Sequence, residues 1–120
     1  MRHLKEGVGW RLGYDPDASV FNGLVGGDRW AVELTEAEVS DFCRLALQLA
    51  DTVRSLSAEL MAEERIACEQ ETAHIWLEVE GLPNQFALRF ILLQGRRTEG
   101  GWTEIATAEM IQANPSLKSF

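Results

Sequence analysis

Two strand-rich stretches, each followed by a helix, set the plan of this chain. A long helix beginning at Thr35 separates the strand patterns of the first third from those that begin at Arg65. A shorter helical pattern, with Ile105, Met110 and Ile111, closes the chain. No long helical crossover joins successive strands, and this order is typical of antiparallel sheets. The sequence therefore predicts an α+β fold with antiparallel sheets, one long central helix and a short C-terminal helix.

The long helix has the most specific local signal. Thr35 followed by Glu38 predicts a capping box, in which each side chain satisfies a free backbone N–H of the first turn. Apolar residues then recur at steps of four and three, which places them on one face. They are Phe42, Ala46, Leu49, Val53, Leu56 and Leu60. We expect this stripe to pack against a sheet, and its width also permits a homodimer through a partner helix.

The strand patterns are shorter and alternate in polarity. In the first half we expect strands over residues 8–14, 20–25 and 29–34, with Asn22-Gly23 as an alternative hairpin turn and His3 in a frayed terminus. In the second half we expect strands over residues 65–71, 73–80 and 85–93, and one entering Trp102. A symmetrical hairpin about residues 81–84 places Ile75 opposite Phe90, Leu77 opposite Leu88, Val79 opposite Phe86 and Trp76 opposite Arg89.

Length and composition indicate one folded domain over residues 1–120, with 46% hydrophobic and 25% charged residues. The net charge of -8 is centred on the long helix and disfavours long-range attraction to polyanions. Residues 1–6 lack the apolar segment of a signal peptide, and no apolar run is long enough to span a membrane, so we expect a cytoplasmic protein. Cys43 and Cys68 are expected to be buried, free thiols.

No constellation of catalytic or metal-ligating residues stands out. His74 lies near Glu78 on one strand face, and the spacing of Glu69, Glu71, His74 and Glu78 is not diagnostic of a metal. The glycine-rich stretches match no nucleotide-binding pattern, and no serine has the context of a nucleophile. We therefore expect a non-enzymatic protein with no cofactor and no metal.

Trp76 and Arg89 form the most suggestive pair. An indole and a guanidinium side by side on a sheet face can stack on unpaired bases, while Arg11, Arg29, Arg96 and Arg97 neutralise phosphates. The same aromatic residue can anchor a protein partner, or simply cover the sheet. Glu78 and Glu80 on this face weigh against a nucleic acid.

Several strings in combination carry a family resemblance. They are Gly9-Trp10-Arg11-Leu12-Gly13, Trp30-Ala31-Val32-Glu33-Leu34-Thr35, Asp41-Phe42-Cys43-Arg44-Leu45, Trp76-Leu77-Glu78-Val79-Glu80-Gly81, and Arg96-Arg97 with Glu99-Gly100-Gly101-Trp102. With them, nearly the whole chain resembles a small cyanobacterial family of unknown function. That resemblance implies a fold like that of the Whirly and PC4-type transcriptional regulators that bind single-stranded DNA. It assigns no functional residues.

Two hypotheses about function follow. In the first, the domain binds single-stranded nucleic acid, with Trp76 and Arg89 stacking and the four other arginines contacting phosphate. In the second, it is an acidic protein–protein interaction adaptor that does not bind nucleic acid. The charge favours the adaptor, whereas the resemblance favours nucleic acid.

Overall fold

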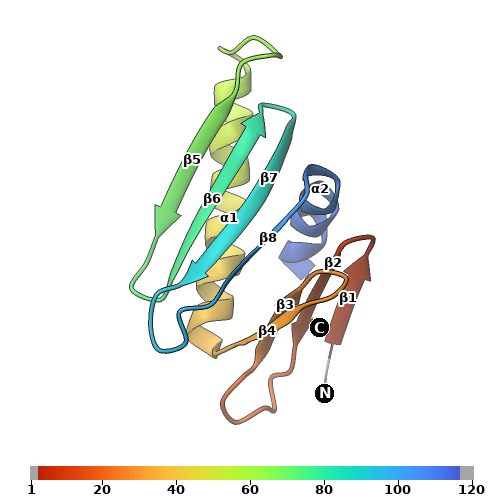
Figure 1. Ribbon diagram of the computed structural model, residues 1–120, viewed down its shortest axis with the longest axis vertical. Helices are drawn as coiled ribbons and strands as arrows, with labels where there is room; N and C mark the ends of the chain where they lie inside the picture. Colours follow the sequence, from red (N-terminus) through yellow and green to blue (C-terminus); the bar gives the residue numbers. More distant parts are fainter. Residues whose placement is uncertain (1–2, 117–120) are drawn as a thin grey trace.

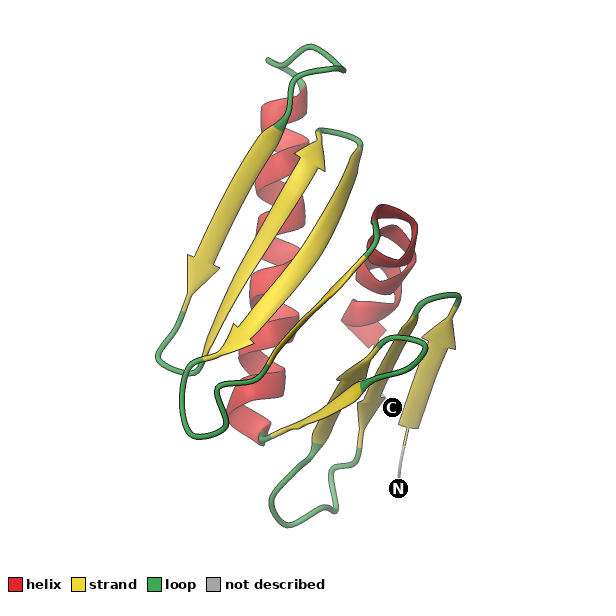
Figure 2. Ribbon diagram, viewed as in Figure 1, coloured by secondary structure: helices red, strands yellow, loops and turns green. Residues whose placement is uncertain are grey.

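A computed structural model describes residues 3–116, so the termini, including the start of the segment 1–6 discussed above, lie outside the described residues. The described chain forms two four-stranded antiparallel sheets, each followed along the chain by a helix. Figures 1 and 2 show how the sheets and helices are arranged. The first unit contains β1 (His3–Gly7), β2 (Trp10–Tyr14), β3 (Gly23–Gly26), β4 (Ala31–Leu34) and α1 (Glu36–Ser57). The second contains β5 (Ile66–Glu71), β6 (Ile75–Leu82), β7 (Gln85–Leu92), β8 (Glu99–Trp102), α2 (Glu104–Ala113) and η1 (Asn114–Ser116). This confirms the predicted α+β fold.

The first sheet contains one strand more than the sequence pattern predicted. The expectation that His3 lies in a frayed terminus is wrong, because His3 begins β1 and pairs with Tyr14 of β2. Gly9 makes the tight β1–β2 turn with a φ of 84°, a backbone conformation that suits glycine. The strand expected from residue 20 begins only at Gly23, because the N–H of Asp15 donates to the carbonyl of Asn22 and closes a loop before it.

Helix α1 confirms the predicted capping box. The N–H of Glu38 donates to the Thr35 hydroxyl at 3.2 Å, and the Glu38 carboxylate accepts from the Thr35 N–H at 2.9 Å. The apolar stripe is buried from Phe42 to Val53 and packs against β5 and β6. Since the fold already covers this part of the stripe, it is not free to pair with a partner helix. Leu60 lies beyond the helix, which ends at Ser57.

The β6–β7 hairpin corrects the predicted pairing. A two-residue turn, Pro83-Asn84, joins Leu82 to its partner Gln85, so every cross-strand pair is shifted by two residues from the symmetrical hairpin. Because the shift is even, the predicted faces are unchanged. The inward pairs are Ile75 with Leu92, Leu77 with Phe90 and Val79 with Leu88, and on the outer face Trp76 pairs with Ile91 and Glu78 with Arg89.

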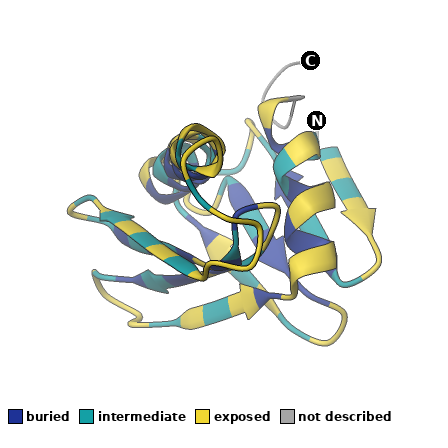
Figure 3. Ribbon diagram, turned by 90° about the horizontal axis from the view of Figure 1, so that it is seen from above, coloured by how far each residue is buried: buried dark blue, intermediate teal, exposed yellow. Residues whose placement is uncertain are grey.

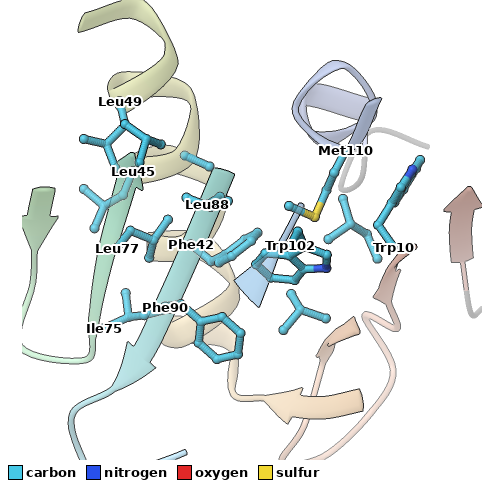
Figure 4. Packing of buried hydrophobic residues seen from close by; sticks show 14 of the residues in the cluster. Trp10, Phe42, Leu45, Leu49, Ile75, Leu77, Leu88, Phe90, Trp102 and Met110 are labelled. Atoms are coloured by element: carbon cyan, nitrogen blue, oxygen red, sulfur yellow. The ribbon is translucent and has the colours of Figure 1, made fainter. Parts of the chain in front are cut away.

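The core lies where the two sheets and the helices meet, and Figure 4 shows the side chains that fill it. Trp30 of the first unit packs on Trp102 of the second, with ring centroids 5.4 Å apart. The Trp102 indole N–H donates to the carbonyl of Gly26 at 2.8 Å. Gly100 permits this arrangement, because a Cβ there would lie 2.7 Å from the Trp30 ring. Each unit thus contains a glycine pair followed by a tryptophan, Gly26-Gly27 with Trp30 and Gly100-Gly101 with Trp102, and the two motifs pack on each other.

Figure 3 shows buried residues gathered toward the interior and exposed residues on the outer surfaces. Neither Cys43 nor Cys68 forms a disulfide, as expected, but both side chains are only half-buried. Neither helix in the described part of the chain is long and apolar enough to span a membrane.

Candidate functional site

The outer face of the second sheet is strongly acidic. Along β5 and β6 the residues alternate between the α1 side and the solvent side, so that every second side chain lies on the outer face. The register brings together residues from all four strands, which we call the outer sheet face: Ala67, Glu69, Glu71, Trp76, Glu78, Glu80, Gln85, Ala87, Arg89, Ile91, Glu99 and Gly101. Five of these are glutamates. Arg89, and Arg65 just before β5, are the basic residues at this face, so it carries a net negative charge.

A linked set of contacts crosses this face from β5 to β7. The Trp76 indole N–H donates to Glu69 Oε2 at 2.7 Å. The guanidinium carbon of Arg89 lies 5.0 Å from the centre of the Trp76 ring, within the range of a cation–π contact. Arg89 Nε also donates to Glu78 Oε1 at 2.7 Å. The polar groups of the predicted pair are therefore held by two carboxylates of the same face.

The carboxylates act directly on Arg89. Its hydrogen bond to Glu78 raises the pKa of the guanidinium above its ordinary value, and the charges of Glu78, Glu80 and Glu99 raise it further. Arg89 is therefore positively charged at any pH at which proteins fold. Because Arg89 is exposed, this is a statement about charge state and not a large source of stability.

Beside Arg89 the face is hollowed into an open groove of about 650 Å³. Its lining includes the small residues Ala87 and Gly101. It also includes Arg89 and two carboxylates, Glu78, which pairs with Arg89, and Glu80, which pairs with Arg65. The small residues can contact the aliphatic stem of a lysine or arginine side chain, whereas both carboxylates of the groove already pair with arginines of this chain.

The structure places Arg11 away from this face, in the first sheet. Its Nε donates to the carbonyl of Gly27 at 3.0 Å, and its NH2 donates to the carbonyl of Trp30 at 2.8 Å. These bonds hold the turn between β3 and β4. For Arg11 to contact a phosphate it would have to give up bonds that the fold uses.

Arg96 is also engaged within the fold. Its guanidinium donates to the carbonyl of Glu33 and to the carboxylate of Glu38, which is almost fully buried at the start of α1. It also lies 4.8 Å from the centre of the Phe21 ring. Arg96 therefore ties the β7–β8 loop to the first unit.

Arg29 and Arg97 are exposed, in the β3–β4 turn and the β7–β8 loop respectively. Of the six residues expected to form the site, the fold thus brings together Trp76 and Arg89. The other four occupy turns and strands outside the outer sheet face. Within residues 3–116, no group of three or more acidic, histidine or cysteine residues is arranged to hold a metal ion.

Sequence reasoning missed the convergence of the acids. When charges are summed along the sequence, the acidic and basic residues of the strand regions nearly cancel, and the excess negative charge falls on the long helix. The usable signal was the alternation of Glu69, Glu71, Glu78 and Glu80, because residues two apart in a strand share one face. Glu99 joins them only through the β7–β8 pairing, which the sequence pattern did not define.

Comparisons with known proteins agree with the fold and assign no activity. Residues 5–117 match the family described as "Domain of unknown function (DUF1818)". A crystal structure of a protein with unknown function from the DUF155 family, from Prochlorococcus sp. NATL2A, is 30% identical and has a TM-score of 0.91. The alignment covers 98% of each chain. No curated protein matches the chain.

Proposed function

This chain belongs to the DUF1818 family, a domain of unknown function, and we propose that it is a non-enzymatic interaction module that binds a basic segment of a partner protein. The binding surface is the outer sheet face. The chain acts as one domain, and the half-buried free thiol of Cys68 suits a reducing compartment such as the cytoplasm.

The observation that carries this proposal is how the Trp76–Arg89 pair is held. Glu69 accepts from the indole and Glu78 from the guanidinium, while Glu71, Glu80 and Glu99 add further negative charge on the same face. An anionic ligand would meet five carboxylates and two arginines, Arg89 and Arg65, each of which already pairs with a glutamate of this face. A cationic ligand meets complementary charge, which favours encounter and excludes wrong partners.

The tryptophan strengthens the case for a protein ligand. Its ring is partly exposed and fixed in orientation by contacts to Glu69 and Arg89, so little side-chain freedom remains to be lost on binding. Rigid aromatic residues of this kind are frequent anchors at the centres of protein interfaces.

Single-stranded nucleic acid is the second candidate. The stacked arrangement of Trp76 and Arg89 favours it, because both planes can stack on unpaired bases. The resemblance to single-stranded-DNA-binding regulators points the same way through the order of strands and helices. Arg29 and Arg97, which are exposed, are the arginines best placed to contact phosphate without loss of internal bonds.

Two labelled probes separate these candidates: a peptide of alternating lysine and valine, and a single-stranded oligothymidylate. Each is titrated with the protein by fluorescence anisotropy at low and at physiological salt. We expect the peptide to bind, with an affinity that falls as salt rises, and the oligothymidylate not to bind. The reverse preference would replace the proposal by nucleic-acid binding, and binding of neither probe would reject both.

A charge-matched pair of variants tests where the peptide binds. Glu71→Gln with Glu80→Gln removes two charges from the outer sheet face without removing a hydrogen-bond acceptor of Trp76 or Arg89. Glu59→Gln with Glu63→Gln removes two charges from the segment between α1 and β5. The first variant should bind the peptide more weakly than the second. Equal affinities would show that net charge, and not this face, attracts the peptide.

A further inference from the structure

Strand β5 forms an open edge of the second sheet. The strand order is β5-β6-β7-β8, so β5 pairs on one side only, and Figure 1 shows no strand beyond it. The elements that contact β5 substantially are β6, beside it, and α1, beneath it. Such an edge presents a row of backbone N–H and C=O groups to which another strand can pair.

The backbone groups that face this open edge can be identified. The N–H of Thr72 donates to the carbonyl of Ile75 at 2.9 Å, which marks Thr72 and Ile75 as a hydrogen-bonded pair at the end of the β5–β6 ladder. Because such pairs alternate in an antiparallel ladder, Ile66, Cys68 and Gln70 bond to β6. The N–H and C=O groups of Ala67, Glu69 and Glu71 therefore point outward.

The neighbouring ladder supports this assignment independently. The N–H of Leu93 donates to the carbonyl of His74 at 2.9 Å, so the even-numbered residues of β6 bond to β7 and its odd-numbered residues bond to β5. None of the backbone hydrogen bonds found outside the ladders in the described chain uses Ala67, Glu69 or Glu71.

We propose that the basic partner segment adds to this edge as an antiparallel strand beside β5, with basic and aliphatic residues in alternation. This inference rests on the proposed function and states how the partner binds. In an antiparallel pair, residues directly opposite each other share a face. The partner's basic side chains therefore lie beside Glu69 and Glu71 on the outer sheet face, and its aliphatic side chains lie beside the half-buried Ile66 and Cys68.

Charge selects a basic partner over a second copy of this chain. If two β5 edges paired antiparallel about Glu69, the two Glu69 side chains would face each other and each Glu71 would face Ala67 of the other copy. Directly opposed like charges destabilise a strand pair, whereas opposite charges stabilise it. The glutamates thus hinder self-pairing of an edge that contains no proline.

The test uses the unmodified protein with two N-methylated forms of the lysine–valine peptide. In an antiparallel addition the lysine N–H groups bond to the outward groups of β5, and the valine N–H groups point away. N-methylation of the lysines should weaken binding by about 10-fold or more, and N-methylation of the valines should change it by less than about 3-fold. The inference would be overturned if both methylated peptides lost the same affinity, or if the peptide methylated at its valines lost more.

A protein variant gives a second reading. Ala67→Pro removes an outward N–H without removing a bond to β6, whereas Ala67→Val keeps it; thermal unfolding verifies that both remain folded. We expect Ala67→Pro to weaken binding of the peptide by about 2- to 10-fold and Ala67→Val to leave it unchanged. If Ala67→Pro and Ala67→Val bound the peptide with equal affinity, the inference would be overturned. It would also be overturned if the natural protein were a dimer that Ala67→Pro dissociates, because the β5 edge would then be occupied by a second copy of the chain. If the unmethylated peptide does not bind at all, the proposed function itself fails.

Discussion

The guanidinium of Arg89 lies 5.0 Å from the centre of the Trp76 ring, although the residue opposite Arg89 in the β6–β7 ladder is Glu78 and not Trp76. The contact is diagonal and spans two residues along the sheet. Arg89 thereby touches the aromatic ring and the carboxylate at once, and the carboxylate raises its pKa. The pair that resembles a base-stacking platform is thus built into an acidic surface.

We expect Trp76→Ala to weaken binding of the basic peptide by about 10-fold, because the substitution removes a rigid aromatic anchor from the binding surface. Val8→Ala is the control, since Val8 is 79% exposed in the β1–β2 turn of the other sheet. Fluorescence anisotropy measures both affinities. If Trp76→Ala and Val8→Ala bind the peptide equally well, the tryptophan is only a covering of the sheet.

We expect Arg96→Ala to lower the free energy of unfolding by about 2 kcal/mol, because it leaves the buried Glu38 carboxylate without its cation. Arg97→Ala, one residue on and exposed, should change it by less than about 0.5 kcal/mol. Urea unfolding measures both values. Similar small losses would mean that Arg96 is a surface arginine like its neighbour.

We expect Arg11→Ala to destabilise the protein by about 1–2 kcal/mol, since the carbonyls of Gly27 and Trp30 lose a shared donor. Arg29→Ala, in the same turn but exposed, should change stability by less than about 0.5 kcal/mol. The same urea titration compares them. An Arg11→Ala protein as stable as Arg29→Ala would contradict the structural role of Arg11.

The sequence predicted the elements that depend on local signals. The capping box at Thr35 marked the start of α1, and alternation assigned the residues of β6 and β7 to the correct faces. The position of the hairpin partners depended on the turn. Taking residues 81–84 as the turn, instead of Pro83-Asn84, displaced each partner by two residues, and this is why Trp76 was placed opposite Arg89.

The candidate site could be predicted only in part. Trp76 and Arg89 were found because strand periodicity places them on one face. The roles of Arg11 and Arg96 depend on contacts with residues distant in the sequence, such as Trp30 and Glu38. A basic residue in a loop looks the same in a sequence whether it faces solvent or holds another segment in place.

The most direct test is the effect of Arg89→Ala on the two probes. The variant removes the one cation at the centre of the outer sheet face and leaves five glutamates there. If this face binds a basic protein segment, the lysine–valine peptide should bind Arg89→Ala about 2- to 5-fold more tightly than the natural protein, and oligothymidylate should bind neither. The proposal would be contradicted if oligothymidylate bound the natural protein but not Arg89→Ala, and if the peptide bound both proteins with the same affinity.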